Sequence, residues 1–411
     1  MQITQKERIS LAQAFFIPKL ILSGTNALEL LGARVGACGK RALIVTGRHV
    51  RQLEAFHRLE ALLAAQQVDY AVFDGITGEP DDTMIAAGAQ AYRDTGCDFL
   101  IAMGGGSPID SMKAIAVTAA SGRNVCDYYG RIIDLPLPPM IAIPTTAGTG
   151  SEATQFTVIT DTARNIKMLL KGACLLPDIA VVDGALGADA PKSVTASTGL
   201  DALTHAVEAY TSRRAQPLTD ALCVSAVTRI FRWLPVAYRS AAAGAVPAEE
   251  AARARSEMAS AALEAGIAIN NSSVTIVHGM SRPIGALYHV PHGLSNAMLL
   301  PRCMAFAAGV ADPAQADPEA QARFAALGRA VGAAAGSDSD AAAAAAFVRA
   351  LGELCTVCEV PTLAQYGIDR ADFLAHAEKM AADALASGSP ANTRRTVTAD
   401  DELRIYRALF D

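Results

Sequence analysis

Short apolar runs alternate with helical stretches between residues 41 and 182. The runs are apolar on both faces, which is typical of parallel strands covered by helices on both sides. We predict strands over 42–46, 70–73, 99–103, 140–143 and 179–182. Amphipathic periodicity predicts helices over 51–66, 82–95 and 108–119. Strands and helices in alternation indicate an α/β fold with a parallel sheet.

The pattern changes after about residue 193, where strand signals vanish and helix follows helix. The predicted helices span 199–212, 219–240, 248–269, 278–286, 295–308, 319–335, 341–355, 371–386 and 400–410. We therefore predict an α/β dinucleotide-binding domain over 1–192 and an all-helical domain over 193–411. A ligand cleft is expected between them, at the carboxyl ends of the strands.

Charge and hydropathy exclude several classes of partner. The 411 residues have a net charge of −6 and no run of Lys and Arg, which argues against nucleic-acid and membrane surfaces. Proline interrupts the uncharged stretches 135–151 and 283–301, so neither is expected to span a membrane. The first ten residues do not resemble a signal peptide. We expect a cytoplasmic protein.

Cys355 and Cys358 form the one C-x-x-C spacing among the 8 cysteines. A redox motif normally opens a helix after a strand, whereas this pair closes a helical pattern just before Pro361. We interpret the pair as two semi-buried thiols one turn apart.

A first glycine-rich turn follows the predicted strand 99–103. Three consecutive glycines at 104–106 lead into a helix, with Ser107 as the expected N-cap, Pro108 at the first helical position and Asp110 in a capping box. Glycine lets a phosphate approach the backbone N–H groups at a helix N-terminus. The turn differs from the G-x-G-x-x-G fingerprint, because its sixth position is Ile109.

A second turn, PTTAGTGSE at 144–152, also follows an apolar strand and offers hydroxyl and backbone donors. Alone it is moderate evidence for a nucleotide site, and the alternative is an ordinary polar loop. Two such turns after parallel strands favour a nucleotide cleft.

Carboxylate and imidazole side chains gather in the helical half. Asp201 and His205 are four residues apart, hence on one helix face, and His278, His289 and His292 follow. One carboxylate with two or three imidazoles suits Fe²⁺, Zn²⁺, Mn²⁺, Co²⁺ or Ni²⁺. Spacing alone leaves open which of them are ligands.

These strings together resemble the iron-containing (group III) alcohol dehydrogenase family along essentially the whole chain. The resemblance is carried by GGGSPIDSMK (104–113), PTTAGTGSE (144–152), LLPDIAVVD (175–183), TGLDALTHAVEAY (198–210) and VHGMSRPIGALYHVPHG (277–293). It implies a dehydroquinate-synthase-like dinucleotide domain joined to a helical metal domain, in a homodimer or higher homo-oligomer.

The resemblance also implies site residues. The metal ligands and catalytic centre would be Asp201, His205, His278 and His292, with His289 outside the set. The dinucleotide would be lined by Gly105, Gly106, Ser107, Thr145, Thr146, Thr149 and Lys167. The implied cofactors are Fe²⁺, or Zn²⁺ or another divalent transition metal, and NAD or NADP. The implied reaction interconverts a small alcohol and its aldehyde or ketone by hydride transfer.

Two positions depart from the common family pattern. Gly47 and Arg48 stand where many members have an acid that holds the adenosine ribose. The loss of that acid would admit the 2′-phosphate of NADP, with Arg48 attracting it, or Gly47 merely turns the chain and Arg48 is solvated. Gly47 is thus a candidate cofactor residue.

The second departure is Arg282, where many relatives have a histidine credited with relaying protons. Because arginine stays charged, proton release would need ribose hydroxyls, water or His289. Arg282 would bind a substrate carboxylate or, as we slightly prefer, make a structural ion pair.

Other functions fit the sequence less well. A maleylacetate-reductase-like or hydroxy-acid dehydrogenase belongs to the same superfamily, but the full ligand set favours the metal-dependent branch. A dehydroquinate-synthase-type lyase would be expected to carry more Lys and Arg in the cleft. A metal hydrolase or an interaction protein would leave both glycine turns unexplained.

Overall fold

A six-stranded parallel sheet forms the core of the N-terminal half in the computed structural model, which describes residues 13–242 and 244–410. The strand order is β1, β8, β5, β4, β2, β3. Their bounds are Leu20–Ser23 (β1), Ile179–Val182 (β8), Met140–Pro144 (β5), Phe99–Gly104 (β4), Arg41–Val45 (β2) and Asp69–Phe73 (β3). The five predicted strands and their parallel arrangement are confirmed, each end within one residue, whereas β1 was not predicted.

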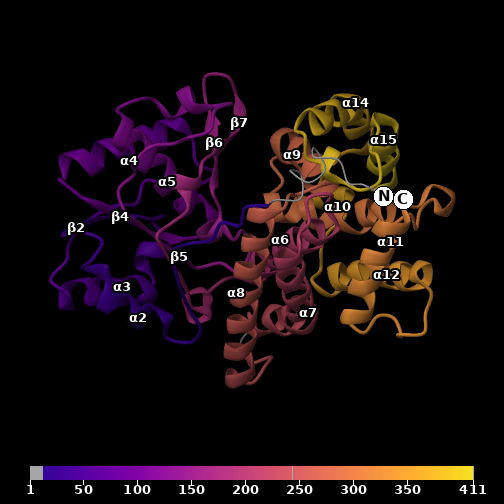
Figure 1. Cartoon of the computed structure of the whole chain (residues 1–411), viewed down its shortest axis with the longest axis horizontal. Helices are drawn as coiled ribbons and strands as arrows, with labels where there is room; N and C mark the ends of the chain where they lie inside the picture. The colour runs from indigo at the N-terminus through magenta and orange to yellow at the C-terminus, as the bar shows by residue number, and fades with distance from the viewer. Residues whose placement is uncertain (1–12, 243, 411) are drawn as a thin grey trace, which may run out of the picture.

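Two pairs of helices cover the two faces of this sheet (Figure 1). They are α2 (Ala27–Val35) and α3 (Glu54–Ala65) on one face, and α4 (Asp82–Asp94) and α5 (Gly106–Ser121) on the other. Successive strand residues point to opposite faces. Accordingly Leu43 packs in one apolar cluster with Ile115 of α5, and Ile44 in another with Phe56 of α3. Burial on both faces explains the continuous apolar runs.

An antiparallel hairpin, β6 (Phe156–Asp161) and β7 (Ile166–Lys171), was missed. It is fastened to α5, where the buried Lys113 Nζ donates to the Phe156 carbonyl at 2.9 Å. Asp110 Oδ2 accepts from the Val158 backbone N–H at 2.9 Å. The predicted capping box at Asp110 is therefore wrong, because this carboxylate binds the hairpin instead.

The C-terminal half is helical throughout its described part, as predicted. Its helices are α6 (Lys192–Thr211), α7 (Pro217–Ser240), α8 (Ala248–Asn271), α9 (Ile276–Tyr288), α10 (His292–Ala307), α11 (Pro318–Ala330), α12 (Asp340–Val357), α13 (Leu363–Tyr366), α14 (Arg370–Ala386) and α15 (Ala399–Ala408). Helix α6 packs against α7, α8 and α10 (Figure 1). The domain boundary at residue 192 stays a prediction.

Several helix ends differ from the predicted ones. The helix expected over 51–66 is broken by the extended Leu53 into a short 3₁₀ turn and α3. Helix α5 has Gly105 at its N-cap, so the assignment of Ser107 as N-cap is wrong. Short 3₁₀ helices also occur at Val50–Gln52, Val125–Tyr128, Ser151–Ala153, Ala173–Leu175, Gly184–Gly187, Pro313–Gln315 and Pro390–Asn392.

Candidate metal centre and cofactor cleft

Three helices bring four side chains that can ligate a metal to one place. Helix α6 supplies Asp201 and His205, α9 supplies His278 and α10 begins with His292. Helix α10 reaches α6 through Gly293, since a Cβ there would lie 2.4 Å from the Ser197 carbonyl oxygen. Glycine at this position therefore places His292 beside Asp201.

The four side chains converge on one carboxylate oxygen. Asp201 Oδ1 lies 3.8 Å from each of the Nε2 atoms of His205, His278 and His292. The His205 and His278 rings are stacked, with centroids 4.7 Å apart. Candidate ligand atoms of Asp201, His278 and His292 all lie within 4.8 Å of one another. One carboxylate oxygen and three imidazole nitrogens at this spacing fit a divalent transition metal.

Burial sets the charge state of this group of ligands. Asp201, His205 and His278 are buried, whereas the His292 side chain is 42% exposed and marks the open side. Burial would raise the pKa of Asp201, but the three imidazoles and Asn296 outweigh it, so the pKa lies below its usual value. Burial and the neighbouring histidines hold the pKa of His278 well below its usual value. The group thus contains an ionised carboxylate beside a neutral His278 imidazole.

Two further residues that contact the candidate ligands were not predicted from the sequence. Asn296, one helical turn after His292, places Nδ2 2.8 Å from Asp201 Oδ1 and 3.2 Å from the Nε2 atoms of both His278 and His292. Glu208, which is buried, lies 2.5 Å from His278 Nδ1 through Oε2. Burial raises the pKa of Glu208, and hydrogen bonds from Thr275 and Val277 oppose the rise. The available sequence signals were the helical spacings that put Asn296 on the same face as His292 and Glu208 on the same face as Asp201.

The two glycine-rich turns face each other at the carboxyl ends of β4 and β5. A Cβ on Gly105 would lie 3.3 Å from Thr146 Oγ1, and one on Gly106 would lie 2.9 Å from Thr149 Cγ2. The strands themselves are linked where the Thr145 N–H donates to the Gly104 carbonyl at 2.9 Å. Ser107, in the first turn of α5, is half-buried like the two glycines before it.

The second turn also contacts the metal-ligand helix. A Cβ on Gly148 would lie 2.5 Å from the Thr198 side chain, one helical turn before Asp201 on α6. The structure thus brings both glycine turns and the four candidate ligands into one region between the sheet and the helices.

The remaining predicted cofactor residues, Lys167 and Gly47, belong to neither glycine-rich turn. The Lys167 ammonium pairs with Glu79 Oε2 at 2.6 Å. Burial is the main cause that lowers the pKa of His292, and the charge of Lys167 adds a small contribution in the same direction. Gly47 follows β2 and forms an isolated bridge to Gly75. Arg48 is exposed, and the described residues provide no hydrogen-bond or ion-pair partner for it.

Arg282 and His289 take different positions relative to the ligands. Arg282 is half-buried one turn beyond His278 and donates to Ser389 Oγ at 3.2 Å. Within the described residues it forms no ion pair, so the expected ion pair is replaced by this hydrogen bond. His289 is exposed, with φ 53° at the end of α9, and does not join the four ligands.

The cysteine pair lies at a helix end as predicted, but both residues are buried rather than semi-buried. Cys355 and Cys358 are free and buried at the end of α12. Burial raises the pKa of each thiol to about 12, so the reactive thiolate is scarce at neutral pH.

A dinucleotide-type sheet domain beside a helical metal centre defines a metal-dependent oxidoreductase. The model of the iron-containing alcohol dehydrogenase family matches residues 18–184, and that of the Fe-containing alcohol dehydrogenase C-terminal domain matches 195–410. The chain belongs to the iron-containing alcohol dehydrogenase family. It is therefore an oxidoreductase that acts on the CH–OH group of alcohols, as the resemblance implied.

Individual relatives agree with this membership. The chain is 35% identical over 401 residues to a 1,3-propanediol dehydrogenase of Citrobacter freundii, covering 96% of this chain and 98% of that one. It is 37% identical over 294 residues to an NAD-dependent methanol dehydrogenase of Bacillus methanolicus, covering 71% and 75%. A crystal structure of a 1,3-propanediol oxidoreductase superposes with a TM-score of 0.89 at 32% identity, covering 97% and 100%. In the described part of the chain, no helix is both long and apolar enough to cross a membrane.

Proposed function

We propose that the chain is a metal-dependent, NAD(P)-linked dehydrogenase that interconverts a small alcohol and its aldehyde or ketone, with Asp201, His205, His278 and His292 as the metal ligands. The observation that carries this proposal is the convergence of three imidazoles on Asp201 Oδ1, each at 3.8 Å. The glycine turns beside α6 supply the second half of the site.

The side chains divide the work of the reaction between them. When bound, Fe²⁺ or a similar cation supplies a Lewis acid that polarises the alcohol oxygen, and the nicotinamide accepts hydride. Asp201 contributes the negative charge that attracts a cation. His278, buried and neutral, offers a nitrogen lone pair. His292 stands on the exposed side, from which a substrate can enter.

The glycine turns are proposed to hold the dinucleotide, with Ser107, Thr145, Thr146, Thr149 and Lys167. Gly105 and Gly106 leave the backbone N–H groups at the start of α5 open, and a helix N-terminus favours a phosphate. The absence of a Cβ at both positions lets the Thr146 and Thr149 side chains face the same space.

We also propose that the cofactor pocket accepts NADP as well as NAD. Gly47 offers no carboxylate to repel a 2′-phosphate, and the exposed Arg48 offers a positive charge. Comparing kcat/KM for the two cofactors tests this, and Gly47→Asp is expected to lower the value for NADP selectively. Negligible wild-type activity with NADP would contradict the proposal.

The main experiment follows reduced cofactor by its near-ultraviolet absorbance, with a panel of short alcohols, diols and hydroxy acids. Chelation is expected to abolish turnover and Fe²⁺ to restore it. His278→Ala and His292→Ala are each expected to lose bound metal and turnover together. His376→Ala is a matched control, because this exposed α14 histidine contacts Asp372 and none of the ligands. Full activity of metal-free His278→Ala would refute the proposal.

A cytoplasmic homodimer or higher homo-oligomer completes the proposal. The sheet ends at the edge strand β1, and Phe16 and Ile17 just before it are 38% and 47% exposed. Light scattering on the purified protein tests for an oligomer, and a monomer at micromolar concentration would contradict it.

A further inference from the structure

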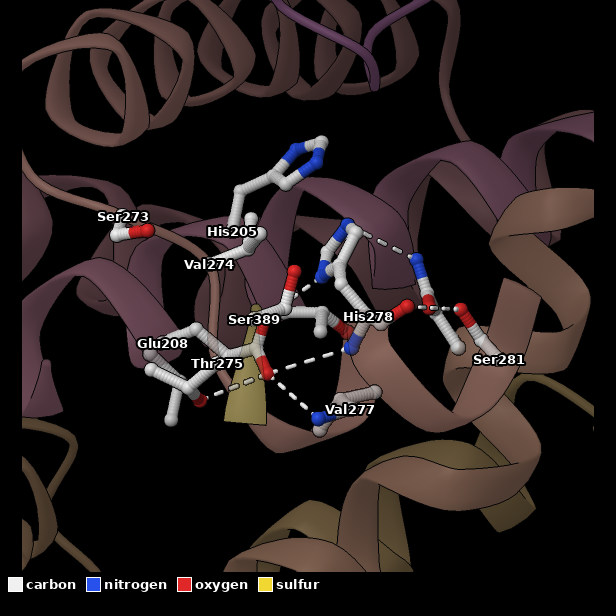
Figure 2. A network of polar contacts seen from close by, with 12 residues as sticks. His205, Glu208, Ser273, Val274, Thr275, Val277, His278, Ser281 and Ser389 are labelled. Atoms are coloured by element: carbon white, nitrogen blue, oxygen red, sulfur yellow. Dashed lines mark hydrogen bonds and ion pairs between the residues drawn. The ribbon is translucent and has the colours of Figure 1, made fainter. Parts of the chain in front are cut away.

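Helix α6 presents a third functional side chain on the face that carries the proposed ligands. Asp201, His205 and Glu208 are spaced four and three residues apart, so they lie along one side of the helix. Glu208 is 0% exposed, and its Oε2 lies 2.5 Å from His278 Nδ1. Figure 2 shows this carboxylate between Thr275, Val277 and the imidazole of His278.

The other oxygen of Glu208 is held by donors from the start of α9. Oε1 accepts from Thr275 Oγ1 at 2.8 Å and from the Val277 N–H at 2.7 Å, with the His278 N–H at 3.4 Å (Figure 2). Together these three donors occupy Oε1. They also fix the plane of the carboxylate, so Oε2 faces the imidazole.

The contacts of its two ring nitrogens determine where His278 carries its proton. A neutral imidazole has one N–H and one lone pair, and the Asn296 Nδ2 donor lies 3.2 Å from Nε2, so Nε2 keeps the lone pair. The N–H is therefore at Nδ1, where it donates to Glu208 Oε2 at 2.5 Å. The bare nitrogen is the one that lies 3.8 Å from Asp201 Oδ1.

We propose that Glu208 is a positioning residue that fixes the Nδ1–H tautomer of His278 and so leaves Nε2 free to bind the metal. The inference rests on the proposed metal function. The bare Nε2 faces Asp201 Oδ1 at 3.8 Å, so a ring held in this orientation offers its lone pair to a cation bound there. Glu208 thereby raises metal affinity without touching the ion.

Glu208→Gln tests this with nearly the same shape. The N–H of Val277 and the hydroxyl of Thr275 require the amide oxygen on their side, which turns the amide NH₂ toward His278 Nδ1. That nitrogen must then accept, the proton moves to Nε2, and the lone pair for the metal is lost. We expect the affinity for Zn²⁺, measured by competition with a chromophoric chelator, to fall about 10- to 100-fold.

Glu264→Gln is the matched control, a half-buried carboxylate on α8 that pairs with Arg229 at 3.4 Å and lies outside the ligand cluster. It is expected to bind Zn²⁺ like the wild type. Equal Zn²⁺ affinity in folded Glu208→Gln and wild type would overturn the inference while leaving the proposed function intact. A wild type that bound no Zn²⁺ would instead overturn the proposed function, and this inference with it.

A second test uses the wild-type protein alone, so it does not depend on whether a variant folds. Nitrogen-15 NMR of the chelated protein is expected to show His278 protonated at Nδ1 and bare at Nε2. The opposite tautomer would overturn the inference directly.

Discussion

Gly106, the first residue of α5, lies against the Thr149 side chain, which leaves no room for a Cβ at this position. We expect Gly106→Ala to raise the dissociation constant for reduced cofactor about tenfold, or ~1.4 kcal/mol. The reason is that its Cβ would lie 2.9 Å from Thr149 Cγ2 and displace that side chain. Cofactor fluorescence titration measures the change.

Metal content should stay unchanged in Gly106→Ala, because the ligands come from other helices. Gly352→Ala is the control, since a Cβ there would meet nothing within 4 Å. Equal cofactor affinity in Gly106→Ala and wild type would argue against phosphate binding at this turn.

A second prediction concerns the side chain of Arg282. It is half-buried and donates to Ser389 Oγ, so we assign it a structural role beside the ligands. Arg282→Ala is expected to cost about 1 kcal/mol of stability, from one hydrogen bond. It should change KM for hydroxy acids and neutral alcohols by the same factor. A rise confined to hydroxy acids would show that Arg282 binds a substrate carboxylate.

At the scale of elements, the chain reveals its parallel strands more readily than its hairpin. Strands such as Phe99–Gly104 are buried on both faces, so their sequence is a continuous apolar run. The hairpin strands Phe156–Asp161 and Ile166–Lys171 instead alternate buried and exposed residues, and their anchor to α5 is the buried Lys113. No local sequence pattern predicts that a lysine will be buried.

Helix α15 carries a buried acid, Glu402, that has no partner to stabilise its charged form in the described part of the chain. Glu402 is 0% exposed, and neither carboxylate oxygen has a hydrogen-bond partner in the described part of the chain. Burial, and secondarily Asp401, raise its pKa from 4.5 to about 8. The folded state therefore keeps this proton up to about pH 8, whereas the unfolded chain releases it above pH 4.5. Stability consequently falls as pH rises through this window.

Glu402→Gln should remove this pH dependence. We expect the variant to match the wild type near pH 4.5 and to exceed it by about 1–3 kcal/mol above pH 8, in unfolding of chelated protein by denaturant. The exposed Glu378→Gln serves as the control. A wild type and Glu402→Gln with parallel stability profiles from pH 5 to 9 would contradict the assignment.

For the whole molecule, the relative position of the two halves decides what the site contains. A loop of the sheet half meets α8 backbone to backbone, since a Cβ on Gly150 would lie 2.4 Å from Gly266 Cα. The next contact, Gly148 against Thr198, aligns the cofactor turn with the ligand helix.

Site residues that lie on one helix could be predicted from the sequence, whereas those brought together by packing between helices could not. Asp201 and His205 share one helix face, so their proximity follows from spacing alone. Asn296 and Glu208 act only because α9 and α10 meet α6, and asparagine and glutamate at helical spacing are usually solvated. Their roles depend on tertiary contacts across about 70 to 95 residues of chain, which no local pattern encodes.

The central claim is that one divalent cation is held between α6, α9 and α10 beside the glycine turns. Anomalous diffraction at the iron edge, from crystals of Fe²⁺-loaded protein, tests it most directly. We predict one peak within bonding distance of Asp201, His205, His278 and His292. A peak elsewhere, or these four side chains without one, would contradict the account.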